Sequence, residues 1–491
     1  MKRFVSFSKR SRVVAMLIAL ALIAAVEFTL LAQQLESLEI SKMRDYGAKG
    51  YVSDEVWYVD SARNILEKVF GLLPRFEGSP RATIVYPNAS MMDRAVEEAP
   101  RYGVKVLFYK LPSGRYFFEK IPAIYVEARS IEDIERFAHA TNATDIVFGW
   151  VLGDAENIDT YLNTEHPPMA KYLIALVMAT LGDRPLYWRI PSICAGVALV
   201  VLTFLLIYEA TRSELLALLT SVLLLVDPMV RNLASIAMLD IFVATFSVLA
   251  VYLALRRRIV AAVLAVCMGA TFKFSALFAA IPVAALFLHQ LVSQGVRRVS
   301  DVFEKLIAFV LFVASTFLTI QVAVSIPLIN YLGFGTWFEQ SITGAVSWHL
   351  STKCVGPGCP PASTPLDWFF NLNTFPLYVG ELNLAASGLE PVYALAFVLM
   401  LISIPSMALD KPRSRILWYA LLGIFLGYVA IWFAGSRTQY SFYAVQLAPF
   451  IHGFVVVRGY ELLRRSVLWR TLVEWYRLFA MCWETLLKFF E

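Results

Sequence analysis

The sequence predicts an all-α membrane protein with about 10-11 transmembrane helices and a small inserted α/β lobe outside the membrane. Its 491 residues are 58% hydrophobic and only 16% charged, with a mean hydropathy of +0.63, which lies well outside the range of soluble proteins. Apolar runs of span length recur along the chain. The net charge of +5 comes with no basic tail or basic face. The composition therefore favours a polytopic membrane protein and gives no indication of a nucleic-acid partner.

The first apolar run covers residues 13–33 and follows a basic cluster at the N-terminus. A secretory signal has the same charge pattern. This run is long enough to cross a bilayer, and it lacks a good small-residue cleavage site. We therefore predict a retained signal-anchor helix, with residues 1–33 forming the cytoplasmic tail and the first span.

Further spans are expected wherever the apolar runs recur. They are 190–208, 214–227, 237–255, 259–272, 275–292, 304–326, 391–408, 416–434 and 440–458. The runs 214–227 and 259–272 are short for a hydrocarbon core of about 30 Å. An even number of spans leaves both termini on the same side of the membrane.

Basic residues predict which side that is, because loops rich in Lys and Arg are retained in the cytoplasm. Clusters of them fall on alternate connections: Lys2 and Arg3, Arg212, Arg256 to Arg258, Arg297 and Arg298, Lys411 to Arg415, and Arg464 and Arg465. The opposite connections carry mainly isolated cations. We therefore expect cytoplasmic termini, an extracytoplasmic active site, and an integral protein of the cell membrane of an archaeon or bacterium.

Two of the outward connections are long, and they define the expected domain organisation. The first, 34–189, contains strand-like and helix-like pieces that predict an α/β lobe at about 76–160. The glycosylation triplets at Asn88 and Asn142 are in keeping with external exposure. The expected units are 1–33, 34–189, 190–326 with spans two to seven, 327–390, 391–460 with spans eight to ten, and 461–491.

Two of the five cysteines lie in the second outward connection. Cys354 and Cys359 bracket the turn-forming residues Val-Gly-Pro-Gly, so they can close a small disulfide loop in an oxidising compartment. The C-terminal segment spaces its large apolar residues three and four apart, with charges on the opposite side. This pattern predicts an amphipathic helix on the inner membrane surface.

Most conspicuous polar residues fall on the predicted outer side. They are Asp54, Glu55 and Tyr58 after the first span, His166, Lys171 and Arg189 before the second, Asp240 at the start of the fourth, Lys273 between the fifth and sixth, and Arg437 between the last two. A charge deep in a bilayer costs about 2.5–3.5 kcal/mol on insertion scales, so Asp240 and Lys273 should face a cavity or a partner. Acids and bases gathered at one end of a helical bundle indicate a catalytic site.

The order of these motifs resembles that of protein O-mannosyltransferases and the related bacterial aminoarabinose transferases, which are GT-C glycosyltransferases that use lipid-phosphate sugars. The matching motifs are Asp54-Glu55 with Tyr58, His166-Pro-Pro with Lys171, Arg189-Ile-Pro, Met238-Leu-Asp240, and Lys273-Phe-Ser. The resemblance covers about 45–60 and 160–280, and the C-terminal half only loosely. The family usually joins its first two motifs by a much shorter link, so the inserted lobe bears on acceptor choice.

The resemblance implies that Asp54 is the general base and leaves Glu55 to position the acceptor or support the structure. Transfer from a lipid phosphate to a hydroxyl needs one base, and it needs cations for the charge that grows on the leaving phosphate. Arg189 is the first choice for the phosphate, because guanidinium can bind two oxygens at once. Lys273 and Arg437 are further candidates for this contact. Tyr58, His166, Lys171 and Asp240 are expected in supporting roles.

Structural roles compete with each of these assignments. Asp54 can cap a helix, His166 can shape the entry into the short apolar segment 169–181, and Lys171 and Arg189 can extend toward head groups. Asp240 can cap the fourth span or orient a neighbouring cation. The outer aromatic residues Trp348, Trp368, Tyr440 and Tyr443, with His349, are equally typical of the membrane interface.

The favoured function is transfer of mannose, or another hexose, from a polyprenyl (dolichyl-type) phosphate to Ser or Thr of an exported protein. The expected partners are this donor, an acceptor protein or lipid, and membrane lipids. A lipid or glycan acceptor is the first alternative, a transporter or flippase of lipid-linked sugars the second, and an inactive scaffold the third. The Trp-Trp-Asp-Tyr-Gly signature of oligosaccharyltransferases is absent. The sequence suggests no cofactor, gives no positive indication of a metal site, and leaves the metal requirement open.

Overall fold

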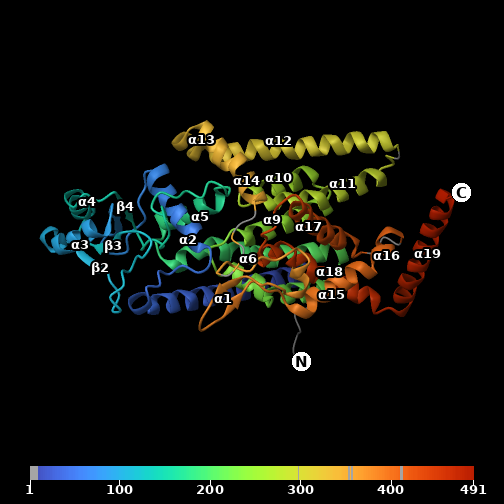
Figure 1. The fold of residues 1–491 in the computed structure, drawn as a ribbon. Helices are drawn as coiled ribbons and strands as arrows, with labels where there is room; N and C mark the ends of the chain where they lie inside the picture. Colours follow the sequence, from blue (N-terminus) through green and yellow to red (C-terminus); the bar gives the residue numbers. More distant parts are fainter. Residues whose placement is uncertain are drawn as a thin grey trace, which may run out of the picture.

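The structure is a computed structural model that describes residues 9–490, except Arg297, Thr352, Lys353, Val355, Pro357 and 410–412. Of the basic residues predicted to be cytoplasmic, Lys2, Arg3, Arg297 and Lys411 lie outside this range. A helical body occupies most of the molecule, and a small α/β lobe lies at one end of it (Figure 1). The prediction of a mostly helical protein with a small inserted sheet is confirmed.

Five helical segments are long and apolar enough to cross a membrane, by length and composition. They are Arg10–Tyr46, Pro185–Thr211, Phe274–Ser293, Val299–Leu332 and Arg415–Phe433. The first, second, fourth and fifth lie in α1 (Lys9–Tyr46), α6 (Pro185–Thr211), α12 (Val299–Leu332) and α17 (Arg415–Phe433); the third joins a 3₁₀ turn to α11 (Ala280–Ser293). The protein is therefore an integral membrane protein.

The other five predicted spans are also helical but shorter. They are α7 (Glu214–Leu225), α9 (Asp240–Leu255), α10 (Ile259–Ala270), α15 (Glu390–Ile402) and α18 (Ala448–Leu462). The 12 residues of α10 extend only about 18 Å, against about 30 Å of hydrocarbon. Helices α7 and α9 pack directly on α6, and α10 packs on α9, so one face of each is buried against other helices. Leu215 and Leu219 of α7 and Val260 and Leu264 of α10 are exposed, so α7 and α10 also carry an apolar outer face.

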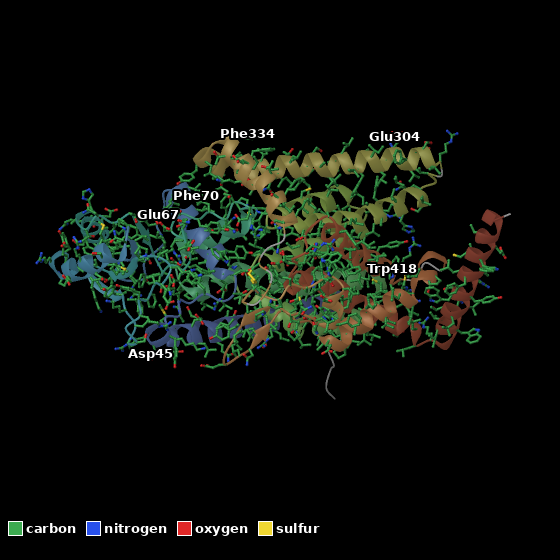
Figure 2. The ribbon with its side chains drawn as sticks, viewed as in Figure 1. Asp45, Glu67, Phe70, Glu304, Phe334 and Trp418 are labelled. Atoms are coloured by element: carbon green, nitrogen blue, oxygen red, sulfur yellow. A yellow bond between two sulfur atoms is a disulfide. The ribbon has the colours of Figure 1, made fainter. Side chains whose placement is uncertain are left out.

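Helix α12 is the clearest lipid-facing element. It is 34 residues long and lies along the outer edge of the helical body, with Glu304 and Phe334 close to its two ends (Figure 2). Large apolar side chains on it are exposed, among them Val310, Leu311 and Leu318. Such a long apolar surface is stable only against lipid or a partner.

The lobe is a four-stranded antiparallel sheet with two helices on one face. Its strands are β1 (Arg81–Val85), β2 (Lys105–Phe108), β3 (Ala123–Glu127) and β4 (Asp145–Phe148), in the spatial order β2-β3-β1-β4. Helix α3 (Ala89–Glu98) follows β1 and α4 (Ile131–Ala140) follows β3. This βαββαβ order is the ferredoxin-like arrangement. The lobe lies inside the predicted range 76–160.

Successive side chains along each strand point to opposite faces of the sheet, so the two faces have different neighbours. Ile84, paired with Ile124 and Ile146, packs with Met92 and Phe137 of the two helices. The opposite face is also covered, by side chains of the surrounding loops and by α1: Val85, Phe117, Tyr125, Val147, Leu152 and Met43 form one cluster. The first helix therefore continues to Tyr46, beyond the expected end at residue 33, because its last turns support the lobe.

Two further elements complete the chain. Cys354 and Cys359 are joined by a disulfide in the connection 327–390. The C-terminal helix α19 (Arg465–Phe490) packs on α16 (Ile404–Leu409) and α18. It keeps Trp469 and Phe479 exposed while Thr471 and Glu474 are buried. Its location on the inner membrane surface remains a prediction.

The turn Ile65–Val69, between α2 (Glu55–Asn64) and the lobe, gives a testable pH dependence. Burial raises the pKa of Glu67 to about 7, and Asp145 adds to the rise, against the opposing effects of Lys68, Arg63 and the Phe148 amide. The folded state thus holds a proton that the unfolded chain releases near pH 4. Stability falls as the pH rises from about 4 to 7, by about 3 kcal/mol at most, and is then level.

Glu67→Gln is expected to flatten that decline, because the amide carries no charge at any pH in this range. The measurement is the unfolding temperature of the detergent-solubilised protein between pH 4.5 and about 8. Glu97→Gln, on the exposed side of α3, serves as the control and should keep the slope of the wild type. An unchanged slope in Glu67→Gln would contradict the assignment.

Candidate active site

Asp54 occupies the N-cap position of α2, where the helix dipole favours a negative charge. Tyr58 follows one turn later and is buried. Burial raises the pKa of the Tyr58 phenol well above its usual range, and the carboxylates of Asp54 and Asp240 raise it further. Burial likewise raises the pKa of Tyr161, with contributions from Glu165 and Asp54. Asp54 and Asp240, 186 positions apart in the sequence, therefore lie close to the same phenol.

Glu55 and Arg189 form a fully buried ion pair. Arg189 Nε and Nη2 each donate to a Glu55 carboxylate oxygen at 2.8 Å, and both side chains are 0% exposed. Glu55 also accepts hydrogen bonds from the backbone N–H groups of Val52 (2.8 Å) and Ala237 (2.7 Å). Arg189 donates further to the Ala32 carbonyl at 2.9 Å. The pair connects α1, α2, α6 and the segment before α9.

This geometry bears on two of the predicted roles. Neither side chain has surface from which to touch a ligand, and both carboxylate oxygens of Glu55 are used within the protein. A buried pair of this kind positions its helices. The arrangement does not favour Arg189 as the contact for the donor phosphate, and it gives Glu55 the structural role that the sequence left open.

Asp240 and Lys273 form a second buried ion pair. Asp240 begins α9, and Lys273 lies between α10 and the 3₁₀ turn Phe274–Ala279. Lys273 Nζ donates to Asp240 Oδ1 at 2.8 Å, and it lies 3.9 Å from the centre of the Tyr443 ring. Asp240 Oδ2 is buried with no hydrogen-bond partner among the described residues. Asp240 thus has the partner that its position in an apolar helix required.

A mainly apolar cavity of about 290 Å³ opens beside Lys273. Its wall is formed by Lys273, Phe274, Phe278, His349, Tyr428 and Tyr443, among others. A cavity with aromatic walls and a single cation suits an apolar ligand that carries one negative group. His349 and Tyr443, which the sequence analysis treated as equally typical of interfacial residues, line this cavity.

His166 belongs to an aromatic cluster between these two regions. Its ring lies 5.8 Å from that of Tyr58, 5.3 Å from Trp348 and 5.2 Å from His349, all edge to face. Helix α14 (Ala345–Leu350) contributes the last two residues. The second outward connection therefore packs directly on the first at the candidate site.

Lys171 and Arg437 lie at the margin of the site. Lys171 is buried and donates to the backbone carbonyls of Asn163 and His166, the latter at 2.9 Å. Burial lowers the pKa of Lys171 to about 7. It fixes the loop that carries His166 and does not extend to a lipid surface. Arg437 is exposed and lies 3.8 Å from the centre of the Trp432 ring, next to Ser436 of the cavity wall.

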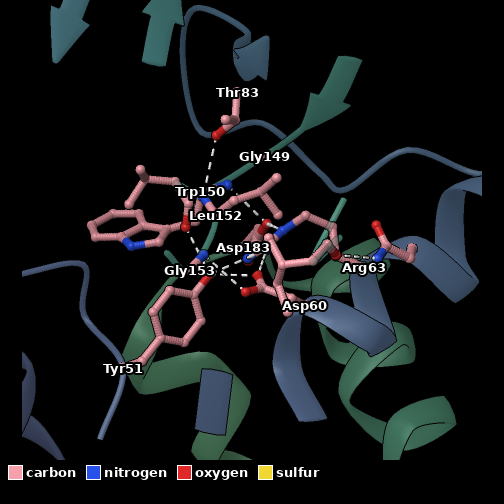
Figure 3. Close-up of polar contacts among 12 residues, drawn as sticks. Tyr51, Asp60, Arg63, Thr83, Gly149, Trp150, Leu152, Gly153 and Asp183 are labelled. Atoms are coloured by element: carbon pink, nitrogen blue, oxygen red, sulfur yellow. Dashed lines mark hydrogen bonds and ion pairs between the residues drawn. The ribbon is translucent and has the colours of Figure 1, made fainter. Parts of the chain in front are cut away.

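A buried charge network that the sequence did not predict lies behind α2 (Figure 3). Arg63 donates to Asp60 and, from Nε, to Asp183 at 2.6 Å. Asp60 also accepts from Tyr51 at 2.6 Å and from the Gly153 N–H at 2.9 Å. Burial raises the pKa of Asp60 to about 6, although Arg63 opposes the rise. The sequence did contain a signal for the Asp60–Arg63 contact, because these two residues have the i, i+3 spacing of an ion pair within a helix.

This network fixes the site to the lobe. Asp183 accepts hydrogen bonds from the Trp150 N–H at 2.8 Å and from Trp188 Nε1 at 2.6 Å, so it links the chain leaving β4 with the start of α6. Asp60 joins α2 to the same segment. The orientation of α2, and with it that of Asp54, depends on how the lobe docks.

The predicted residues thus separate into three groups. Asp54, Tyr58, Asp240 and Lys273 lie together around the cavity and the His166 cluster. Glu55 and Arg189 form the clamp behind them, and Lys171 and Arg437 lie at the margin. Within the described ranges, no three or more His, Cys, Asp or Glu side chains are grouped so that they could hold a metal ion.

Comparison with known proteins gives one family match. Residues 165–320 match the model of the family described as dolichyl-phosphate-mannose-protein mannosyltransferase. This segment contains His166, Lys171, Arg189, Asp240 and Lys273. No curated protein sequence matches the chain significantly.

Solved structures show weaker similarity. ArnT from Cupriavidus metallidurans bound to undecaprenyl phosphate aligns at 17% identity and a TM-score of 0.38, over 62% of this chain and 53% of that one. The apo oligosaccharyltransferase of Archaeoglobus fulgidus aligns at 11% identity and a TM-score of 0.43, over 93% and 52%. This chain spans about half the length of the solved structures that it matches.

Proposed function

Since residues 165–320 match the model of the dolichyl-phosphate-mannose-protein mannosyltransferase family, we propose that this protein is a membrane glycosyltransferase of the GT-C type. It takes a sugar, mannose or another hexose, from a polyprenyl phosphate and transfers it to a hydroxyl group. The observation that carries the proposal is the convergence of the Asp54 carboxylate and the Asp240–Lys273 pair on Tyr58, beside an apolar cavity.

The donor occupies the cavity, with its apolar chain against the aromatic walls. Lys273 is the cation best situated for the donor phosphate, because it reaches the cavity wall while Asp240 holds it. A cation there stabilises the charge that grows on the departing phosphate. Arg437, which follows Ser436 of the cavity wall, is a second candidate to bind the donor phosphate.

The reaction is a single inverting displacement. The acceptor oxygen forms a bond to the anomeric carbon while the bond from that carbon to the phosphate oxygen breaks, and the phosphate leaves with the electron pair. Asp54 takes the proton of the acceptor hydroxyl. One carboxylate suffices because the phosphate leaves without being protonated, unlike the alcohol that leaves in glycosidases.

We infer that the acceptor is a Ser or Thr hydroxyl of an exported protein and that the reaction takes place on the extracytoplasmic side. The lobe is tied to α2, the helix that Asp54 caps, by the Asp60–Arg63–Asp183 network. A folded lobe at the entrance suits a polypeptide acceptor better than a lipid that diffuses in from the membrane.

The test is transfer of labelled mannose from dolichyl-phosphate mannose by the purified full-length protein in lipid nanodiscs. A peptide rich in Ser and Thr and a lipid extract are offered as separate acceptors. Label in the peptide is expected. Label in the lipid fraction alone would support the glycosyltransferase but contradict the protein acceptor, and no donor consumption with either acceptor would overturn the proposal.

A further inference from the structure

A second cavity lies against α19, the helix at the end of the helical body opposite to the lobe (Figure 1). Its volume is about 440 Å³, and residues of α7, α18 and α19 line it. The charged residues of its wall are Arg413, Arg458, Arg464, Arg470 and Glu461. Nothing in the proposed reaction uses this cavity.

The wall of this cavity carries an excess of positive charge. Four guanidinium groups face one carboxylate, so the formal charge of the lining is +3. Glu461 is already engaged: it pairs with Arg458 at 3.3 Å and accepts a hydrogen bond from the Ser414 hydroxyl at 2.6 Å. The remaining positive charge is therefore not balanced by the carboxylate of the wall.

Two arginines carry much of this unbalanced charge. Arg413 donates to the Thr211 carbonyl at 3.1 Å, and Arg464 lies 5.7 Å from the centre of the Tyr460 ring. Within the part of the chain that the structure describes, neither has a carboxylate within 4.0 Å. Both are exposed, and an anion bound between them would offset the repulsion of their like charges.

The arrangement is rigid enough to select its ligand. Arg458 is 1% exposed, and its guanidinium donates to the hydroxyls of Ser403 at 2.9 Å and Ser406 at 2.7 Å. Thr471 of α19 accepts from the same group at 3.2 Å. These contacts fix one cation at the base of the cavity and attach α19 to the wall.

We propose that this cavity binds a phosphate group. A guanidinium group can bind two phosphate oxygens at once. Four arginines and a single glutamate line this cavity. The amphipathic α19 exposes Trp469 and Phe479, side chains typical of a helix lying at the membrane surface, so the cavity opens at head-group level. Basic pockets between helices at that level bind anionic head groups. The phosphate is carried either by such a lipid or by a soluble compound.

The test uses the full-length protein in neutral detergent, with phosphatidic acid and inorganic phosphate as separate probes. Lipid adducts are counted by native mass spectrometry, and phosphate binding is followed by the shift of the unfolding temperature. The variant Arg464→Gln/Arg470→Gln leaves the buried Arg458 in place. Its affinity for the bound probe should fall at least about tenfold, the scale of losing charged hydrogen bonds.

The control is Arg258→Gln, which removes an exposed arginine at the turn between α9 and α10 and should bind as the wild type does. Binding of phosphatidic acid alone identifies a lipid head group as the source, and binding of inorganic phosphate alone a soluble compound. Either result supports the site. Absence of binding by both probes, equal affinity in the double variant, or an equal loss in the control would overturn it.

Discussion

Asp54→Asn is expected to lower the rate of sugar transfer at saturating donor by at least about a hundredfold, the effect of removing a general base. Asparagine has nearly the same size and is an equally good N-cap residue, so α2 should keep its position. The amide cannot take the proton of the acceptor hydroxyl. The measurement is kcat in nanodiscs, with the unfolding temperature as evidence that the variant is folded.

Asp45→Asn is the matched control, because Asp45 is an exposed carboxylate at the end of α1 on the side of the lobe (Figure 2). Its activity should equal that of the wild type. Donor affinity in Asp54→Asn should also change little, since the base acts on the acceptor. Equal transfer rates in Asp54→Asn and the wild type would remove Asp54 from the chemistry.

The sequence allowed the fold class to be predicted because two periodicities differ along the chain. Apolar runs identify the helices of the body, and alternating short segments identify the lobe. Span number was harder to predict. Helices α7 and α10 are apolar all round: one face is buried among other helices, while Leu215 and Leu219 of α7 and Val260 and Leu264 of α10 are exposed. An isolated sequence cannot distinguish burial in protein from contact with lipid.

Residue type indicated which side chains need a partner but not which partner each one has. Asp240 and Lys273 were expected to need partners in an apolar setting, and they are partners of each other. Arg189 was assigned to the phosphate because its chemistry suits that ligand. Only the fold reveals that Glu55, 134 residues earlier, already occupies its guanidinium. Pairings across such separations depend on helix packing, which residue type does not encode.

Glu55→Gln is expected to destabilise the protein by about 3–5 kcal/mol, the cost of leaving one charge of a buried pair unpaired. Arg189→Met should cost about the same, because the carboxylate of Glu55 then stays buried among Val52 and Ala237 with no cation. The measurement is the unfolding temperature and the yield of folded protein in detergent. Both variants should be less stable than the wild type, whether or not they also bind the donor less tightly.

The double variant Glu55→Gln/Arg189→Met distinguishes a structural role of the buried pair from binding of the donor phosphate by Arg189. With both charges gone, no unpaired charge remains, so the double variant should be more stable than the sum of the single changes predicts. Glu127→Gln is the control, since it breaks the partly exposed pair with Arg81 and should cost no more than about 1 kcal/mol. If Arg189→Met instead folds normally and loses only donor affinity, Arg189 binds the donor and the clamp is not its main role. Recovery in the double variant would show that the loss in each single variant comes from the charge left unpaired in the interior, as expected for a structural pair.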